Sequence, residues 1–263
     1  MLIHPNFDPV AVSIFGLDVH WYGLMYVAGF LSCYFLWVYR VRCYKHLQGD
    51  IWNSDIISDL IFYGALGAVL GGRLGYILFY KLGDYLANPS SIFRVWEGGM
   101  SFHGGLLGVL FALFLFARRH GKTFFEISDF VAPVVPIGLF WGRIGNFINQ
   151  ELWGKTTDAP WGMVFTNGGP LPRHPSMLYE AFLEGILLLI VLWILARKPR
   201  ALGFLSGVFL IGYAFARCLV EFVRVPDQHL NYLLSDWVTM GQVLSLPMML
   251  AGFYLVWRAF RNA

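Results

Sequence analysis

Long apolar segments separated by short polar ones dominate the chain from residue 21 onward. Runs of roughly 17 to 25 apolar residues are long enough to cross a hydrocarbon core of about 30 Å as α-helices. The pattern therefore predicts an all-α, polytopic integral membrane protein with about seven transmembrane helices. We expect these spans at Trp21 to Tyr39, Ile56 to Tyr80, Met100 to Phe116, Ile127 to Ile148, Met177 to Ala196, Ala201 to Val223 and Val238 to Trp257.

The composition agrees with this pattern, since 57% of the 263 residues are hydrophobic and only 13% are charged. A soluble core could not bury that much apolar surface.

The opening segment lacks a basic region, and the first apolar run is followed by further spans, so we expect no cleaved signal peptide. The three cysteines have no paired spacing and are expected to be free thiols. No Cys/His set or HExxH motif occurs, so we expect no metal and no cofactor.

The basic residues are distributed unequally between the two sides of the predicted spans. Eleven follow spans one, three, five and seven, whereas five lie in the connections on the opposite side. The positive-inside rule then places the C terminus in the cytoplasm, and an odd number of spans leaves the N terminus outside. Because these residues do not gather on a soluble domain, the net charge of +3 does not indicate a nucleic-acid partner.

The connections on the outer side are the longer ones. Segments 81–99, 149–176 and 224–237 are rich in Gly, Pro, Asn and Asp, whereas the cytoplasmic connections are short and basic. We therefore expect one transmembrane domain, residues 1–263, with an elaborated outer face. In the second span, Gly67, Gly71 and Gly75 recur at intervals of four and predict close packing against another helix.

Three arginines lie inside predicted spans, where each charge costs about 2.5 to 3.5 kcal/mol on insertion scales. Arg73, Arg143 and Arg217 each lie four to seven positions before the outer end of a span. At 1.5 Å per residue they share a layer about 6 to 11 Å below the outer surface. His103 enters the same layer at the start of span three, and the first span adds His20, Tyr22 and Tyr26.

Two segments give this layer its detail. The first runs from Gly142 to Gly154, and we expect its residues Arg143, Asn146 and Gln150 on one helical face. The second runs from Tyr213 to Asp227, and its positions 213, 217, 221 and 224 lie on one face. Arg217 and Glu221 are therefore spaced to pair at i, i+4.

Two planar guanidiniums at one depth suit a phosphate that arrives attached to acyl chains, because each can bind oxygens bidentately. The pattern thus indicates a phospholipid ligand, since a fatty acid or sterol needs fewer cations and a nucleotide calls for a phosphate-binding loop. A single intramembrane arginine can instead reach lipid headgroups or pair with a carboxylate. This alternative stays open above all for Arg73, to which we assign no catalytic role.

The segment from Gly142 to Gly154 reads GRIGNFINQELWG and matches GRxGNFxNxExxG at every fixed position. In this it resembles the prolipoprotein diacylglyceryl transferases. The similarity extends over nearly the whole chain and includes His-Trp-Tyr-Gly at 20–23, GGMSFHGG at 98–105, His-Pro-Ser at 174–176 with Tyr179 and Glu180, and the stretch 213–227. Met177, Cys218 and Val225 depart from the family pattern, but none of them replaces a charged or histidine position.

The resemblance implies a catalytic domain in the bacterial cytoplasmic (inner) membrane, with its active site facing the periplasmic leaflet. Such an enzyme transfers the diacylglyceryl group of phosphatidylglycerol to the lipobox cysteine thiol of a preprolipoprotein, giving a thioether and glycerol 1-phosphate. Its expected partners are phosphatidylglycerol, the signal sequences that carry the lipobox cysteine, and the lipid bilayer. The reaction is the first step of lipoprotein maturation.

The resemblance also implies roles for individual residues. His103 would assist deprotonation of the thiol, or alternatively orient the phosphate, while Arg143 and Arg217 would hold the donor phosphate and stabilise its departure. The other expected donor-binding residues are Tyr26, Asn146, Glu151, Gly154, Tyr213, Glu221 and Arg224.

Two other classes of protein also carry polar residues inside the membrane. A lipid or anion transporter needs a path open alternately to both sides, whereas the inner halves of spans three and five are bulky and apolar. A non-catalytic scaffold explains the glycines but not the convergence of His103, Arg143 and Arg217. Only the enzyme would make thioether product and glycerol 1-phosphate from phosphatidylglycerol and a lipobox peptide.

Overall fold

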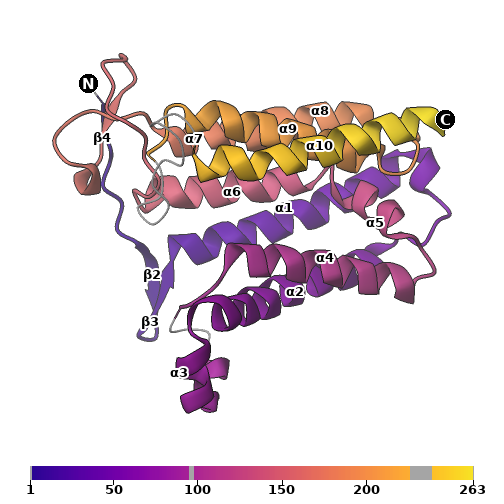
Figure 1. Ribbon diagram of the computed structural model, residues 1–263, viewed down its shortest axis with the longest axis horizontal. Helices are drawn as coiled ribbons and strands as arrows, with labels where there is room; N and C mark the ends of the chain where they lie inside the picture. Colours follow the sequence, from indigo (N-terminus) through magenta and orange to yellow (C-terminus); the bar gives the residue numbers. More distant parts are fainter. Residues whose placement is uncertain (1, 95–97, 226–238, 263) are drawn as a thin grey trace. The chain divides into compact units, whose positions relative to one another are not determined.

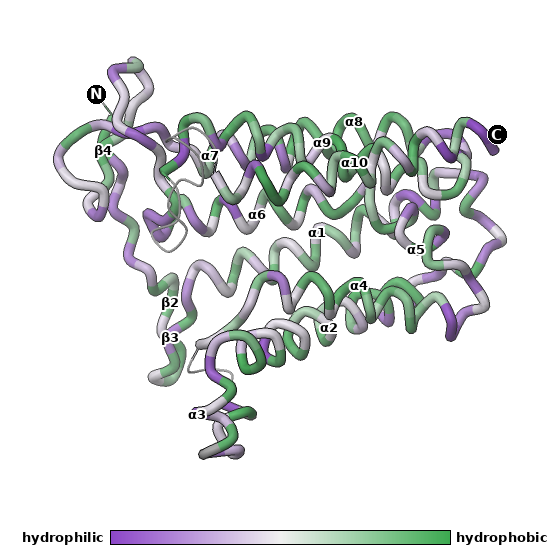
Figure 2. The backbone as a smooth tube through the Cα atoms, viewed as in Figure 1, coloured by the Kyte–Doolittle hydropathy of each residue, from purple (hydrophilic) through white to green (hydrophobic). Residues whose placement is uncertain are grey.

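The computed structural model describes residues 2–94, 98–225 and 239–262. It divides into two compact units, unit 1 with Met1–Trp37 and Asp129–Ala263, and unit 2 with Val38–Ser128. Among the described residues, six helices are long and apolar enough to cross a membrane, or up to seven if one bent pair is a single span. Apolar residues run along these helices (Figure 2). The predicted multi-pass, all-α membrane protein is thereby confirmed.

Unit 2 is built around two helices, α2 (Ser54–Tyr80) and α4 (Phe102–Arg119), which pack against each other. The Asn53 side chain caps α2 by accepting hydrogen bonds from the backbone N–H groups of Asp55 and Ile56. A Cβ added to Gly104 would lie 2.4 Å from the Gly71 carbonyl oxygen. The glycine spacing in the second span therefore serves close helix packing, as predicted.

Unit 1 contains a set of helices that run side by side (Figure 1). They are α6 (Val135–Ile148), α7 (Ser176–Glu180), η5 (Ala181–Leu187), α8 (Leu188–Leu195), α9 (Phe204–Glu221) and α10 (Met240–Arg261). Within it α6 packs on the stretch η5, and α9 packs on both α8 and α10. The stretch η5 is π-helical and continues α7 into α8, so that one run from Ser176 to Leu195 forms the fifth span.

The fourth predicted span, Ile127 to Ile148, is wrong as a continuous helix. The chain instead forms α5 (Phe124–Val131) and α6, with a bend of 51° between them. Pro133 lies at the break and Pro136 lies in the first turn of α6. Proline lacks the N–H that a helix interior requires, so this sequence ends one helix and begins the next.

The remaining long helix, α1 (Trp21–Cys43), begins in unit 1 directly after a hairpin. The hairpin strands β2 (Val10–Ile14) and β3 (Leu17–His20) pair antiparallel, and β1 (Leu2–Ile3) pairs parallel with β4 (Met163–Val164). The apolar pattern did not predict these short strands. Three short helical segments, η1 (Lys45–Leu47), α3 (Leu82–Ala87) and η2 (Pro89–Phe93), lie in unit 2, and η4 (Thr166–Gly168) lies in unit 1.

The predicted segments between spans are only partly described. Segment 81–99 contains α3 and η2, and segment 149–176 contains β4 and η4. Residues 95–97 and 226–238, including the predicted end of the 224–237 segment, Asp227 and the predicted start of the seventh span at Val238, lie outside the described residues. Whether residues 1–263 form a single domain stays a prediction.

Candidate active site

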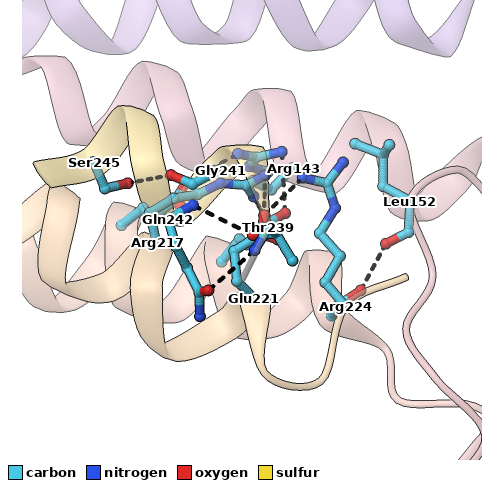
Figure 3. A network of polar contacts seen from close by, with 12 residues as sticks. Arg143, Leu152, Arg217, Glu221, Arg224, Thr239, Gly241, Gln242 and Ser245 are labelled. Carbon is cyan, nitrogen blue, oxygen red and sulfur yellow. Dashed lines mark hydrogen bonds and ion pairs between the residues drawn. The ribbon is translucent and has the colours of Figure 1, made fainter. Parts of the chain in front are cut away.

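Six charged side chains form one chain of ion pairs inside unit 1, with acids and bases in strict alternation. Figure 3 labels four of them, Arg143, Arg217, Glu221 and Arg224. The Arg143 guanidinium lies between two acids, with Nη1 3.0 Å from an oxygen of Glu180 and Nη2 3.0 Å from an oxygen of Glu184. The other carboxylate oxygen of Glu180 accepts a hydrogen bond from Nη1 of Arg217. Glu180 therefore contacts both guanidiniums at once.

The chain of ion pairs continues along α9. Nη2 of Arg217 lies 2.5 Å from Oε1 of Glu221, and Nη1 of Arg224 lies 3.4 Å from the same oxygen. The predicted i, i+4 pair of Arg217 and Glu221 is confirmed. We call the whole set the ionic chain; in order it comprises Glu184, Arg143, Glu180, Arg217, Glu221 and Arg224.

Close helix packing brings these side chains together. Arg143 comes from α6, and a Cβ added to Gly185 in η5 would lie 2.7 Å from the Cβ of Phe140, so α6 and η5 approach closely there. A Cβ added to Gly241 in α10 would lie 2.5 Å from a carboxylate oxygen of Glu221. The absence of a side chain at these two glycines thus lets neighbouring helices approach the ionic chain.

The acids and bases of the ionic chain differ in exposure. The side chains of Glu180 and Glu184 are 0% exposed, whereas those of Arg143 and Arg217 are 17% and 15% exposed. Three positive and three negative charges sum to zero, which lowers the cost of burying them. The two arginine side chains thus remain partly exposed, whereas the acids Glu180 and Glu184 that pair with them are fully buried.

Tyr213 lies beside this network. It interacts electrostatically with Arg143, Arg217, Glu180 and Glu184, and its ring stacks on Phe209 with 6.0 Å between ring centroids. The sequence-predicted residues Arg143, Arg217, Tyr213, Glu221 and Arg224 are therefore brought together.

A second polar cluster lies at the C-terminal end of α6. The Asn146 side chain donates to Oε2 of Glu151 at 2.9 Å, and the Glu151 backbone N–H donates to the Asn146 carbonyl oxygen at 2.9 Å. The Tyr22 ring packs where a Cβ on Gly145 would lie 2.9 Å away, and the rings of Tyr22 and Tyr26 are 5.3 Å apart between centroids. Tyr22 also interacts with the Asn146 side chain. This cluster thus includes Tyr22 beside three predicted site residues.

Gln150 does not share a helical face with Arg143, so that prediction is wrong. Helix α6 ends at Ile148, and Gln150 adopts a left-handed φ of 55°. Its side chain donates to Asn6 at 2.9 Å and accepts from the backbone N–H of Thr166 at 2.7 Å. Gln150 therefore joins the N-terminal segment to the 149–176 segment.

Gly154 has a clear packing requirement. Its backbone N–H donates to the His174 carbonyl oxygen at 2.8 Å, and a Cβ would lie 2.5 Å from the Val223 carbonyl oxygen and 2.8 Å from the Cβ of His174. Any side chain at this position would force two chain segments apart. Its expected contact with the lipid donor stays a prediction.

His103 and Arg73 belong to unit 2. His103 is the second residue of α4, is exposed, and packs edge-to-face on Phe102 with 5.6 Å between ring centroids.

Arg73 is only 4% exposed. Within the described residues, its guanidinium donates to backbone carbonyl oxygens of Ser91, Ile92, Arg94, Gly98 and Gly99. Instead of the headgroup or carboxylate contact considered above, Arg73 thus anchors the segment between α2 and α4.

Sequence reasoning missed the roles of Glu180 and Glu184. Two acids four positions apart in an otherwise apolar span were the available signal, since buried acids need cationic partners. Within the described ranges, no group of three or more His, Cys, Asp or Glu residues is placed to hold a metal ion.

The family model for prolipoprotein diacylglyceryl transferase matches residues 9–258. The chain belongs to this family. The resemblance drawn from the Gly142 to Gly154 segment is thereby confirmed, and the ionic chain and the Asn146 cluster are features of a prolipoprotein diacylglyceryl transferase.

Two relatives show how complete the match is. A protein from Pseudomonas aeruginosa (strain LESB58) is 56% identical over 262 residues, which cover 100% of this chain and 97% of the relative. One from Legionella pneumophila (strain Lens) is 55% identical over 257 residues, covering 98% and 99%. Both are named phosphatidylglycerol--prolipoprotein diacylglyceryl transferase.

Proposed function

We propose that this transferase moves the diacylglyceryl group of phosphatidylglycerol to the lipobox cysteine thiol of a preprolipoprotein, the first step of lipoprotein maturation. Family membership and the full-length relatives support the reaction class. The observation that carries the proposal within the structure is the ionic chain, where two guanidiniums from different helices contact one carboxylate.

The ionic chain suits an anionic lipid headgroup. A guanidinium has five N–H donors, and the ion pairs of Arg143 and Arg217 each involve both Nη atoms. Both arginine side chains remain partly exposed, whereas Glu180, which pairs with both, is buried. Donors left over on these guanidiniums would bind the phosphate oxygens.

The reaction forms a sulfur–carbon bond and breaks a carbon–oxygen bond. The thiolate attacks the glyceryl carbon that bears the phosphate, and the bonding electron pair leaves with the phosphate oxygen as glycerol 1-phosphate. Negative charge grows on the phosphate as it departs, so fixed cations at Arg143 and Arg217 would lower the barrier. The products are the thioether-linked protein and glycerol 1-phosphate.

The thiol must lose its proton, because the thiolate is the nucleophile and an ordinary cysteine is mostly protonated at neutral pH. His103 is exposed at the start of α4, and a neutral imidazole can accept a proton. We propose that His103 accepts the thiol proton.

Other residues would position the donor. Asn146 and Glu151 hold each other at the end of α6, with Tyr26 nearby on α1, and these groups would bind the glycerol headgroup. Tyr213, Glu221 and Arg224 would orient the guanidiniums, and Gly154 would shape the backbone around them.

We further propose an inner-membrane location with the active site in the periplasmic leaflet, an external N terminus and a cytoplasmic C terminus. The charge asymmetry of the connections supports this orientation. The second substrate, a signal sequence with a lipobox cysteine, would then present its thiol at the same leaflet.

The test is a transfer assay with purified protein, phosphatidylglycerol and a lipobox peptide. Thioether-linked peptide and glycerol 1-phosphate should appear in equal amounts. A peptide with serine in place of the lipobox cysteine is the control and should give neither. Transport of the lipid without thioether product would contradict the proposal.

A further inference from the structure

We propose that Glu180 is a positioning residue that holds Arg143 and Arg217 as a ready-made site for one phosphate group. The inference rests on the proposed function and adds to it a residue outside the predicted site. Its basis is the contact of one buried carboxylate with two guanidiniums from separate helices.

The geometry of the contact supports this role. Oε2 of Glu180 lies 3.0 Å from Nη1 of Arg143, while Oε1 accepts from Nη1 of Arg217. Each guanidinium thus meets a different oxygen of the same anion. Two oxygens on one carbon are spaced much like two oxygens on one phosphorus, so the carboxylate already holds the cations as a phosphate would need them.

The energetics point the same way. Two guanidiniums close together repel each other, and in a region of low dielectric this repulsion is strong. An acid between them removes it, and Glu180 is 0% exposed, so water cannot replace the carboxylate. Without Glu180, the two cations would move apart before any donor arrived.

Glu184 provides a matched comparison. It lies one turn further along the same span, is also 0% exposed, and pairs with Arg143 through a contact of 3.0 Å. Among the ion pairs of the described residues, Glu184 joins Arg143 of α6 alone, whereas Glu180 bridges α6 and α9. Neutralising either acid changes the charge of the ionic chain equally, but only loss of Glu180 removes the bridge.

The experiment compares the unmodified full-length protein with Glu180→Gln, Glu184→Gln and Glu180→Asp. Binding of a short-chain phosphatidylglycerol is measured by calorimetry, and kcat is measured with a lipobox peptide. Both Gln variants lose one negative charge, so they should bind the anionic lipid at least as tightly as the unmodified protein. We expect kcat to fall about 100-fold in Glu180→Gln and less than about tenfold in Glu184→Gln, in the range typical for loss of electrostatic preorganisation.

Glu180→Asp keeps the charge but is one methylene too short to reach both guanidiniums. It should fold, keep lipid affinity within about threefold and lose kcat by about tenfold or more. If Glu180→Gln fails to fold, as loss of a buried ion-pair partner can cause, this variant decides the question.

Equal losses of kcat in the two Gln variants, or full activity in Glu180→Asp, would overturn the inference while leaving the transferase function intact. Unmodified protein that makes no thioether product would instead overturn the proposed function, and this inference with it. The two failures are therefore distinguishable.

Discussion

The imidazole Nε2 of His4 lies 2.9 Å from the carbonyl oxygen of Phe147, although the two residues are 143 positions apart in the chain. Nδ1 of the same ring accepts the Asn6 backbone N–H at 3.0 Å. The two contacts require a proton on Nε2 and none on Nδ1, which is the neutral form. His4 thus ties the N-terminal segment to the last turn of α6, next to Asn146.

Burial lowers the pKa of His4 below its ordinary value of 6.5. Above pH 6.5 the ring is neutral in both the folded and the unfolded chain, and stability is unaffected. Below pH 6.5 the unfolded chain binds the proton more readily, so the free energy of unfolding falls as the pH falls toward the lower folded pKa. His4→Gln should show a shallower fall in melting temperature between pH 6.5 and 5. An unchanged slope would mean that His4 does not titrate in this way.

Packing of α2 on α4 gives a second prediction, with its control in the next residue. A Cβ at Gly104 would lie 2.4 Å from the Gly71 carbonyl oxygen, whereas the nearest atom to a Cβ at Gly105 would be the Ala68 carbonyl oxygen at 3.4 Å. Gly104→Ala should therefore destabilise the protein by about 1 to 3 kcal/mol, as overpacking does. Gly105→Ala should cost much less. Equal melting temperatures for both variants would contradict the close approach.

Hydrophobic pattern alone predicted six of the spans, because crossing a membrane constrains length and apolarity directly. It missed the break at Pro133, where the apolar run continues but the hydrogen-bond ladder cannot. Arg143 and Arg217 stood out as isolated charges in apolar spans. Their partner Glu180 needed the structure, because a contact between α6, α7 and α9 depends on how the helices pack and not on spacing within one helix.

The proposed orientation predicts where the C terminus lies. Eleven basic residues on one side against five on the other favour a cytoplasmic C terminus. A reporter fused after Ala263 that fluoresces only in the cytoplasm should be active, and an alkaline phosphatase fusion at the same point should be inactive. The opposite pair of results would invert the proposed topology and place the ionic chain in the inner leaflet.

His103 gives a prediction on the proton transfer. Glutamine cannot accept the thiol proton, so His103→Gln should slow transfer by about 10² at neutral pH, within the usual range for a general base. Above pH 8.5 an ordinary thiol ionises without help, so the loss should shrink there. Lipid binding measured by calorimetry should be unchanged. Loss of lipid binding in the variant would instead assign His103 to the orientation of the phosphate.

Arg143 gives the sharpest prediction, because its two Nη atoms contact two different acids. Lysine keeps the charge but has one nitrogen on a flexible stem, so it cannot pair with Glu180 and Glu184 in the same fork geometry. Arg143→Lys should therefore fail nearly as badly as Arg143→Ala, with a loss on the order of 3 to 4 kcal/mol, or about 10² to 10³ in rate.

Arg197→Lys is the control for this substitution, since Arg197 is exposed beyond the end of α8 and lies outside the ionic chain. It should transfer at the unmodified rate, and all variants should insert in the membrane in equal amounts. Activity of Arg143→Lys within about threefold of the unmodified protein would mean that Arg143 supplies only positive potential. The fork contacts with the two acids would then serve stability alone, and the phosphate would have to be held chiefly by Arg217.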